Sequence, residues 1–162
     1  MAALADPKNQ KRIVIAVVAI IVIIFIWIKW ASIKGFFAKE RANADVKKDA
    51  DDIETSARMK GETESFSTAQ YSSYARQLEE LMAKSTSTQE RKQIVNIITL
   101  MNNNVDWAML VKAFGVRAFK KGGILTSSKT HDLIGWLNVE LNRSEIDAVN
   151  SYFNETGITA RI

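Results

Sequence analysis

Few residues in this sequence have the type and spacing that catalysis requires. His131 is the only histidine, and the pair that it forms with Asp132 could act as a general base. The chain has no cysteine, and no serine stands with His131 in a known nucleophile motif. Motifs that bind nucleotide phosphates or catalytic zinc are absent from the sequence too. We therefore interpret His131 as a surface or capping residue, and predict a protein that is not an enzyme and has no cofactor.

A group of carboxylates in the first half of the chain could in principle hold a divalent cation. It lacks the Asp-x-Asp-x-Asp-Gly order that bends a chain around calcium. A solvated helix face explains the group better, so the sequence predicts no metal site. The residues are Asp45, Asp49, Asp51, Asp52 and Glu54.

A second cluster of charge surrounds Gly122-Gly123 and is basic, with Phe114 and Phe119 interleaved. It is the best local candidate for contacting phosphate, in a lipid head group or a nucleic acid, or for contacting a protein partner. An ordinary solvated loop is the alternative. The residues are Arg117, Lys120, Lys121 and Lys129.

An apolar segment near the N-terminus predicts a transmembrane helix. Residues 13–28 contain no charged or polar side chain, and residues up to 33 extend the helix to about 32 Å, enough for a hydrocarbon core of about 30 Å. No polar face exists for an interfacial helix, and no signal-peptide cleavage site follows. The span contains no G-x-x-x-G motif and no charge before its end, so we interpret it as an anchor. The expected anchor residues include Ile13, Ile20, Phe25, Trp27, Lys29 and Trp30.

The charge distribution supports a membrane more than a nucleic acid as partner. The net charge is +4, and residues 1–41 hold seven basic against two acidic residues. The basic excess thus lies beside the apolar segment, where anionic lipid head groups would be, and argues against nucleic acid binding. Basic residues flank both ends of the span. The positive-inside rule therefore favours only slightly a topology in which the C-terminal side is cytoplasmic or interior.

The rest of the chain predicts an all-α protein. After a basic flank (1–12) and the transmembrane helix (13–33), residues 34–65 are charged and rich in helix formers, which indicates a solvated helical stalk. A disordered linker is the alternative for this stretch. Residues 66–162 show about five amphipathic helices joined by short loops, which is typical of a small bundle. The expected N-caps are Ser67, Ser87, Asn104, Thr130 and Ser144, and Gly115 and Gly157 are expected to end helices.

Apolar residues at helical spacing identify the expected core of this bundle. A loop containing Gly122-Gly123 interrupts it, and Ile124-Leu125 could form a brief extended piece there. The inward residues are Tyr71, Tyr74, Leu78, Leu81, Ile94, Ile97, Ile98, Met101, Trp107, Leu110, Val111, Phe114, Leu133, Ile134, Trp136, Leu137, Leu141, Ile146, Val149, Tyr152 and Phe153.

The C-terminal third of the chain resembles small virion-associated proteins of bacteriophages. The resemblance is carried by the runs Asp106-Trp107, Leu110, Ala113-Phe114-Gly115-x-Arg117, Asp132-Leu133-x-x-Trp136-Leu137-x-x-Glu140-Leu141, Ser144-Glu145, Val149-Asn150-x-Tyr152-Phe153 and Gly157-Ile158. Joined to an N-terminal anchor, these runs are similar to the membrane-anchored structural proteins of icosahedral phages with an internal membrane. That resemblance implies a structural subunit that docks onto the capsid or a vertex protein, and it brings no catalytic residues.

Three functions follow as hypotheses from this organisation. The first is a structural or adaptor subunit that tethers a large protein assembly to a viral internal membrane. The second is a subunit of a bacterial envelope machine, such as a secretion or motility complex in the inner membrane. The third is a lysis effector that acts on a membrane, which fits less well because such proteins seldom need a folded domain of about 95 residues. The sequence leaves open whether the chain also forms a homo-oligomer.

Overall fold

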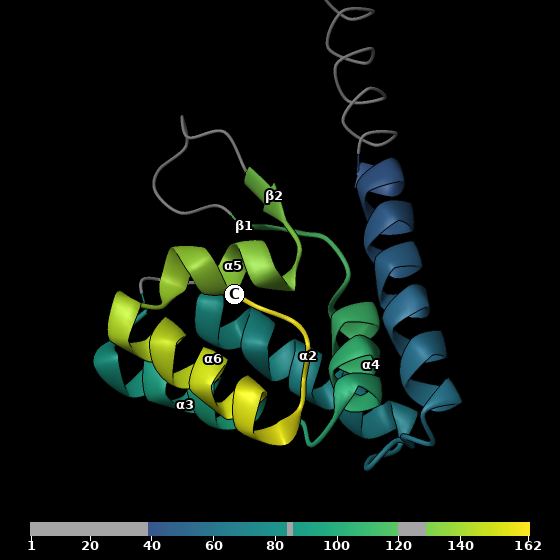
Figure 1. The fold of residues 1–162 in the computed structure, drawn as a ribbon. Helices are drawn as coiled ribbons and strands as arrows, with labels where there is room; N and C mark the ends of the chain where they lie inside the picture. The colour runs from purple at the N-terminus through teal and green to yellow at the C-terminus, as the bar shows by residue number, and fades with distance from the viewer. Residues whose placement is uncertain (1–38, 84–85, 120–128) are drawn as a thin grey trace, which may run out of the picture. The chain divides into compact units, whose positions relative to one another are not determined.

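The computed structural model describes residues 39–83, 86–119 and 129–162 (Figure 1). The chain divides into two units, residues 1–40 and residues 41–162. The basic flank and the expected span of residues 13–33, with Ile13, Ile20, Phe25, Trp27, Lys29 and Trp30, lie outside the described residues. None of the helices in the described ranges combines the length and the hydropathy that a membrane span needs.

The described part of the chain is mostly helical, which confirms its all-α character. The first helix comprises residues 39–59, and we call it the arm helix. Five helices and two short strands follow, and five is the number of helices expected for residues 66–162. They are α2 (Thr68–Met82), α3 (Thr88–Ile98), α4 (Asn104–Phe114), β1 (Arg117–Phe119), β2 (Lys129–His131), α5 (Leu133–Glu140) and α6 (Arg143–Thr156).

Two helix starts have the capping boxes that the sequence predicts. The Ser67 side chain accepts a hydrogen bond from the backbone N–H of Gln70, whose side chain accepts one from the N–H of Ser67. Ser87 and Glu90 make the same reciprocal pair at α3. Each pair satisfies two of the backbone donors that a helix start leaves without an intrahelical partner. These two local predictions are confirmed.

Three other caps differ from the prediction by one or two residues. The caps are Asn103, Asp132 and Asn142, whereas Asn104, Thr130 and Ser144 were expected. Each observed side chain accepts a hydrogen bond from the backbone N–H three residues later. Thr130 is unavailable as a cap because its backbone pairs with Ala118 in the hairpin. The helix stops at Gly115 and Gly157 are confirmed, and both have positive φ angles, 60° and 75°.

A two-stranded antiparallel hairpin occupies the region that was predicted as a loop. Arg117 pairs with His131, Ala118 with Thr130 and Phe119 with Lys129. The indole N–H of Trp136 donates to the carbonyl of Arg117 over 3.1 Å, so β1 is fastened to α5. The extended piece expected at Ile124-Leu125 lies outside the described residues.

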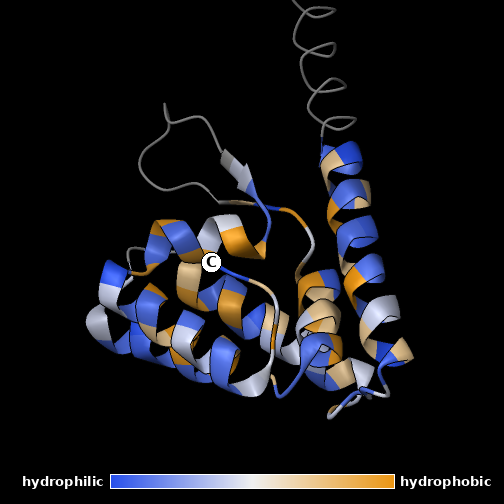
Figure 2. Ribbon diagram, viewed as in Figure 1, coloured by the Kyte–Doolittle hydropathy of each residue, from blue (hydrophilic) through white to orange (hydrophobic). Residues whose placement is uncertain are grey.

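The core of the domain lies between α2 and α4 and continues to α3, α5 and α6. Every inward residue that the helical spacing predicts is buried or partly buried. In Figure 2, hydrophobic residues alternate with hydrophilic ones along the arm helix and α6, the pattern of helices with one buried face. The largest fully buried side chains are Trp107, Tyr71, Phe153, Leu78, Met82, Ile94, Ile98, Met101, Leu110, Leu133, Leu137 and Ile158.

The arm helix belongs to the folded unit, although the predicted helical domain began only at residue 66. Ala50 and Ala57 are 1% and 2% exposed, and Val46 and Ile53 pack against the core. These four residues recur at spacings of four, three and four, so they form one stripe along the helix. The structure confirms a helix over residues 39–59 of the predicted stalk, but this helix has one buried stripe and is not solvated on all sides.

Candidate functional site

The contact between the arm helix and α4 joins polar groups that lie far apart in the sequence, and it is the candidate functional site of the described chain. We call this contact the arm junction. It comprises the buried stripe of the arm helix, the turn at residues 60–66 and the whole length of α4. Ala50 and Ala57 are both small and almost fully buried, so the arm helix approaches its neighbours closely at these positions.

The two partners of the arm junction run antiparallel. Asn43, near the start of the arm helix, contacts the backbone just after α4 ends, and Glu54 contacts Lys112 within α4. Glu62, after the arm helix ends, contacts Asn104 at the start of α4. Contacts thus occur at both ends and in the middle, so the arm helix is held along its length.

Lys112 is the charged centre of the junction. Its ammonium group pairs with the carboxylates of Asp51 and Glu54, and Arg58 adds a 2.7 Å hydrogen bond to Glu54. Hydrogen bonds from Lys112 lower the pKa values of Asp51 and Glu54. Burial opposes the charge on Lys112, but the bonds to these two carboxylates outweigh it and raise the pKa of the ammonium group.

The expected acidic cluster is therefore divided between two roles. Asp45, Asp49 and Asp52 lie on the exposed side of the arm helix, as a solvated face predicts. Asp51 and Glu54 instead contact Lys112 across the junction. Within the described residues no group of three potential ligands is placed to hold a metal ion.

Asn43 and Gly115 lie at the end of the junction where α4 ends. The Asn43 side-chain oxygen accepts a hydrogen bond of 2.6 Å from the backbone N–H of Val116. Gly115 has a φ of 60°, and a Cβ at this residue would lie 3.0 Å from the same Asn43 oxygen. Glycine is therefore required here both by the backbone conformation and by the closeness of the arm helix.

Asp106 fixes the turn at the other end of the junction. Its carboxylate is fully buried and accepts hydrogen bonds from the Tyr71 hydroxyl (2.5 Å) and from the backbone N–H groups of Ser65 (2.8 Å) and Asn102 (2.9 Å). Burial, together with the bond to Asp106, raises the pKa of Tyr71. The carboxylate joins α2, α4 and the turn through groups that are all hydrogen-bonded, which is typical of a structural role.

Asn104 hydrogen-bonds the segment after α6 to the start of α4, which is the end of the junction where Asp106 lies. Its side-chain amide donates to Glu62 (3.1 Å) and to the carbonyl of Gly157 (3.1 Å), and its oxygen accepts from the N–H of Thr159 (2.8 Å). The segment after α6 and the turn after the arm helix are thus held by one side chain. The arm junction thus has polar contacts at both ends of an alanine-lined contact, and these contacts hold the arm helix, α4 and the segment after α6 together.

Of the four predicted phosphate or partner residues, Arg117 is the one whose side chain the structure describes. Arg117 pairs with Glu79, donates to the carbonyl of Phe114 (2.7 Å) and lies 4.7 Å from the centre of the Phe114 ring. Burial lowers the pKa of Arg117, and its guanidinium braces the end of α4. Lys120 and Lys121 lie outside the described residues. Lys129 begins β2, opposite Phe119.

His131 lies within the hairpin and contacts an aromatic side chain. Its ring meets the indole of Trp136 edge to face, with ring centres 5.3 Å apart. His131 was expected to be a surface or capping residue. It is half-buried, and the N-cap of α5 is its neighbour Asp132.

Sequence reasoning missed the arm junction itself. Residues 34–65 were predicted to be a solvated stalk or a disordered linker, although they contain a stripe of small and apolar residues at helical spacing: Val46, Ala50, Ile53 and Ala57. The signal was present, because four small or apolar residues at i, i+4, i+7 and i+11 are the pattern of a buried helix face.

Comparison with protein-family models, with curated proteins and with solved structures finds no match to this chain.

Proposed function

We propose that this chain is a non-enzymatic, single-pass membrane-anchored structural subunit that joins a large protein assembly to a lipid membrane. A viral capsid or vertex is the assembly that fits best, as the resemblance of the C-terminal third implies. The function needs three parts: an apolar anchor, a firm connection and a folded head. The sequence predicts the anchor at residues 13–33, and residues 41–162 form the compact unit that would serve as the head.

The arm junction is the observation that carries this proposal. Only residues 34–38 separate the predicted end of the span from the first described helical residue, and five residues reach at most about 18 Å. From Arg41 onward the chain is part of the compact unit. A subunit built in this way would join its anchor to its head by a short connection, which suits an assembly that is tethered to a membrane.

Membrane attachment is tested by extraction of the full-length chain from membranes of expressing cells. We expect the protein to stay in the pellet at alkaline pH, and the double variant Ile20→Lys/Ile24→Lys to leave it, because each central lysine opposes insertion by about 3 kcal/mol. The control variant Ala44→Lys/Thr55→Lys carries the same added charge on exposed positions of the arm helix and should stay in the pellet. Extraction of the unchanged chain would contradict the anchor.

The tethering role is tested by lysine crosslinking and mass spectrometry on the native membrane-containing source. Lys120, Lys121 and Lys129 serve as handles. Reproducible crosslinks from them to one abundant shell component would support a head that docks onto an assembly. Crosslinks confined to the chain itself, beside normal labelling of exposed lysines, would contradict it.

A further inference from the structure

The chain that follows α6 lies against the domain as an extended peptide, residues 158–162 (Figure 1). Its residues alternate between two environments. Ile158 is 1% exposed and Ala160 and Ile162 pack against the core, whereas Thr159 and Arg161 are exposed. Alternation of this kind gives an extended chain one buried side. We call residues 158–162 the extended segment, and the surface of α4 and α6 that receives it the seat.

Two asparagine side chains of the seat bind the backbone at the two ends of the extended segment. Asn104 of α4 accepts a hydrogen bond from the N–H of Thr159 (2.8 Å) and donates one to the carbonyl of Gly157 (3.1 Å). Asn150 of α6 accepts from the N–H of Ile162 (3.1 Å) and donates to the carbonyl of the same residue (3.0 Å). A carboxamide both donates and accepts, so each asparagine recognises an extended backbone whatever side chains it carries.

The seat is built around an occupant. Asn104 is 6% exposed, and its side-chain oxygen accepts hydrogen bonds from the N–H and the hydroxyl of Thr159 (2.8 and 2.9 Å). Without the extended segment this oxygen would lose both donors, and the site of Ile158 would be an apolar cavity. An empty seat is therefore unfavourable, and a segment of this chemistry is needed to fill it.

The contacts of the extended segment also allow it to leave the seat. Within the described residues, no backbone–backbone hydrogen bond outside the helices and strands involves residues 158–162. Side-chain contacts hold the segment instead, through Asn104, Asn150 and Asn154 and through its own apolar residues. Release of the segment therefore breaks no helix and no sheet, and is a local opening of the fold.

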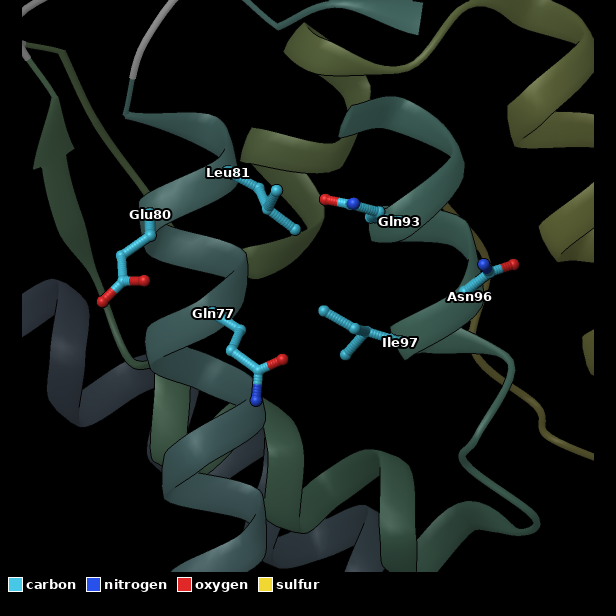
Figure 3. Close-up of a pocket in the computed structure, with 6 residues that line it drawn as sticks. All are labelled: Gln77, Glu80, Leu81, Gln93, Asn96 and Ile97. Atoms are coloured by element: carbon cyan, nitrogen blue, oxygen red, sulfur yellow. The ribbon is translucent and has the colours of Figure 1, made fainter. Parts of the chain in front are cut away.

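Two open grooves beside α3 lack such an occupant. One groove, of about 480 Å³, lies between α2 and α3, where Leu81 and Gln93 point toward each other (Figure 3). The other, of about 300 Å³, lies between α3 and α6. The polar residues that line them are exposed or, for Glu145, paired with Arg91. Neither groove identifies a ligand, whereas the seat is described together with the peptide that fills it.

We propose that the seat also binds the extended segment of a second copy of this chain, by exchange of residues 158–162 between the two copies. The second copy carries the identical segment, so an exchange reproduces every contact of the seat and its cost is the entropy of association. Gly157 is suited to the hinge, because its φ is 75° and glycine adopts positive and negative φ with similar ease. Five extended residues reach at most about 18 Å, so the two α6 helices meet near their C-terminal ends. The proposal concerns the folded unit alone and does not depend on the membrane anchor.

The choice between a chain's own seat and that of a second copy depends on concentration. A short connection such as Gly157 presents the released segment to its own seat at an effective concentration in about the millimolar range. Exchange therefore requires copies at a comparable local concentration, which joint refolding at about 1 mM provides.

Crosslinking between two variants tests the exchange directly, because the chain has no cysteine of its own. Asn154 and Arg161 are exposed and hydrogen-bonded to each other. Full-length Asn154→Cys and Arg161→Cys chains are refolded together from urea in detergent at about 1 mM, diluted and treated with a short bismaleimide. We expect at least tenfold more crosslinked heterodimer than with Ala148→Cys in place of Asn154→Cys, since Ala148 is exposed on the side of α6 toward α3. Equal yields would overturn the exchange.

A chain whose extended segment is locked in its own seat gives a second test. The full-length double variant Asn154→Cys/Arg161→Cys is crosslinked within the chain at low concentration, or has both cysteines blocked as the control, and each form is then refolded at about 1 mM. Sedimentation in detergent should show dimers of the blocked form and at least tenfold fewer dimers of the locked form. Dimers that persist after locking would come from a contact elsewhere and would overturn the proposal, as would a blocked form that stays monomeric.

Discussion

The arm helix and α3 both lie at the edge of the helical domain, but their polar residues are used differently. Along the arm helix, Asn43, Asp51 and Glu54 contact groups of the same domain. Along α3, Gln89, Gln93 and Asn96 are exposed around two grooves. The arm helix is thus fastened to its own domain, whereas α3 offers its amides outward.

This difference separates residues that hold the fold from residues that face solvent. Substitutions in the arm junction should change the free energy of unfolding, since they remove or crowd contacts that hold the fold. Substitutions of the exposed amides of α3 should leave that free energy nearly unchanged.

Removal of the buried carboxylate should have the largest effect. Asp106→Ala leaves the Tyr71 hydroxyl and the backbone donors of Ser65 and Asn102 without their acceptor, and we expect a loss of about 3 kcal/mol in unfolding free energy. Urea denaturation of the full-length protein in detergent measures it. Asp52→Ala, on the exposed side of the arm helix, is the control. An equal loss of unfolding free energy in this variant would contradict the structural role of Asp106.

Overpacking of the alanine contact should have the second-largest effect on the unfolding free energy. Ala50→Leu inserts a large side chain where the arm helix is buried, and we expect a loss of about 2 kcal/mol. Ala44→Leu changes an exposed alanine of the same helix and should alter stability by less than about 0.5 kcal/mol. The same denaturation experiment compares them. Similar values for both would mean that the arm helix is not packed on the domain.

The ion pair at the centre of the junction should contribute less and should depend on pH. Lys112→Met should cost about 1 kcal/mol near neutral pH, because the pair is only partly buried. The pKa values of Asp51 and Glu54 are lowered from 3.8 and 4.5, so the stabilisation is present above these values and is lost as the pH falls through the lower folded-state pKa values.

The raised pKa of Lys112 sets the upper limit of the pH range in which the same ion pair stabilises the fold. Its stabilisation is present below the ordinary value of 10.5 and is lost as the pH rises through the higher folded-state value. Denaturation of the unchanged chain and of Lys112→Met should therefore differ most between about pH 5 and pH 10 and converge in acid. A difference that persists unchanged at pH 2 would show that the methionine acts through packing.

An exposed amide of α3 should contribute least to stability. Gln93→Ala removes a solvent-exposed carboxamide and should change the unfolding free energy by less than about 0.5 kcal/mol. Urea denaturation of the full-length protein in detergent measures the change, and a loss above about 1 kcal/mol would contradict the contrast between α3 and the arm helix.

The helical bundle could be predicted from the sequence because its signals are local. Ser67 with Gln70 and Ser87 with Glu90 specify helix starts by themselves, and large apolar residues at helical spacing identify the core. These features depend only on residues a few positions apart, and the structure reproduces them.

The parts that could not be predicted depend on contacts between distant residues. Alanine is compatible with both exposed and buried helix faces, so Ala50 and Ala57 reveal their role only once α4 lies beside them. The hairpin has strands of three residues, too short for a period-two pattern, and Trp136 fastens it from α5. Arg117 was expected to contact phosphate, yet its surroundings include Glu79, which no local pattern associates with it.

The contacts of the arm junction predict that the arm helix and the helical domain move as one rigid body. Spin labels at Ala44→Cys on the arm helix and Ser151→Cys on α6, in full-length protein diluted with unlabelled chain in lipid nanodiscs, measure it by pulsed dipolar spectroscopy. Both positions are exposed, and the chain has no other cysteine. We expect one narrow distance distribution. A broad distribution, as a flexible linker would give, would contradict the rigid arm junction and the tethering role that rests on it.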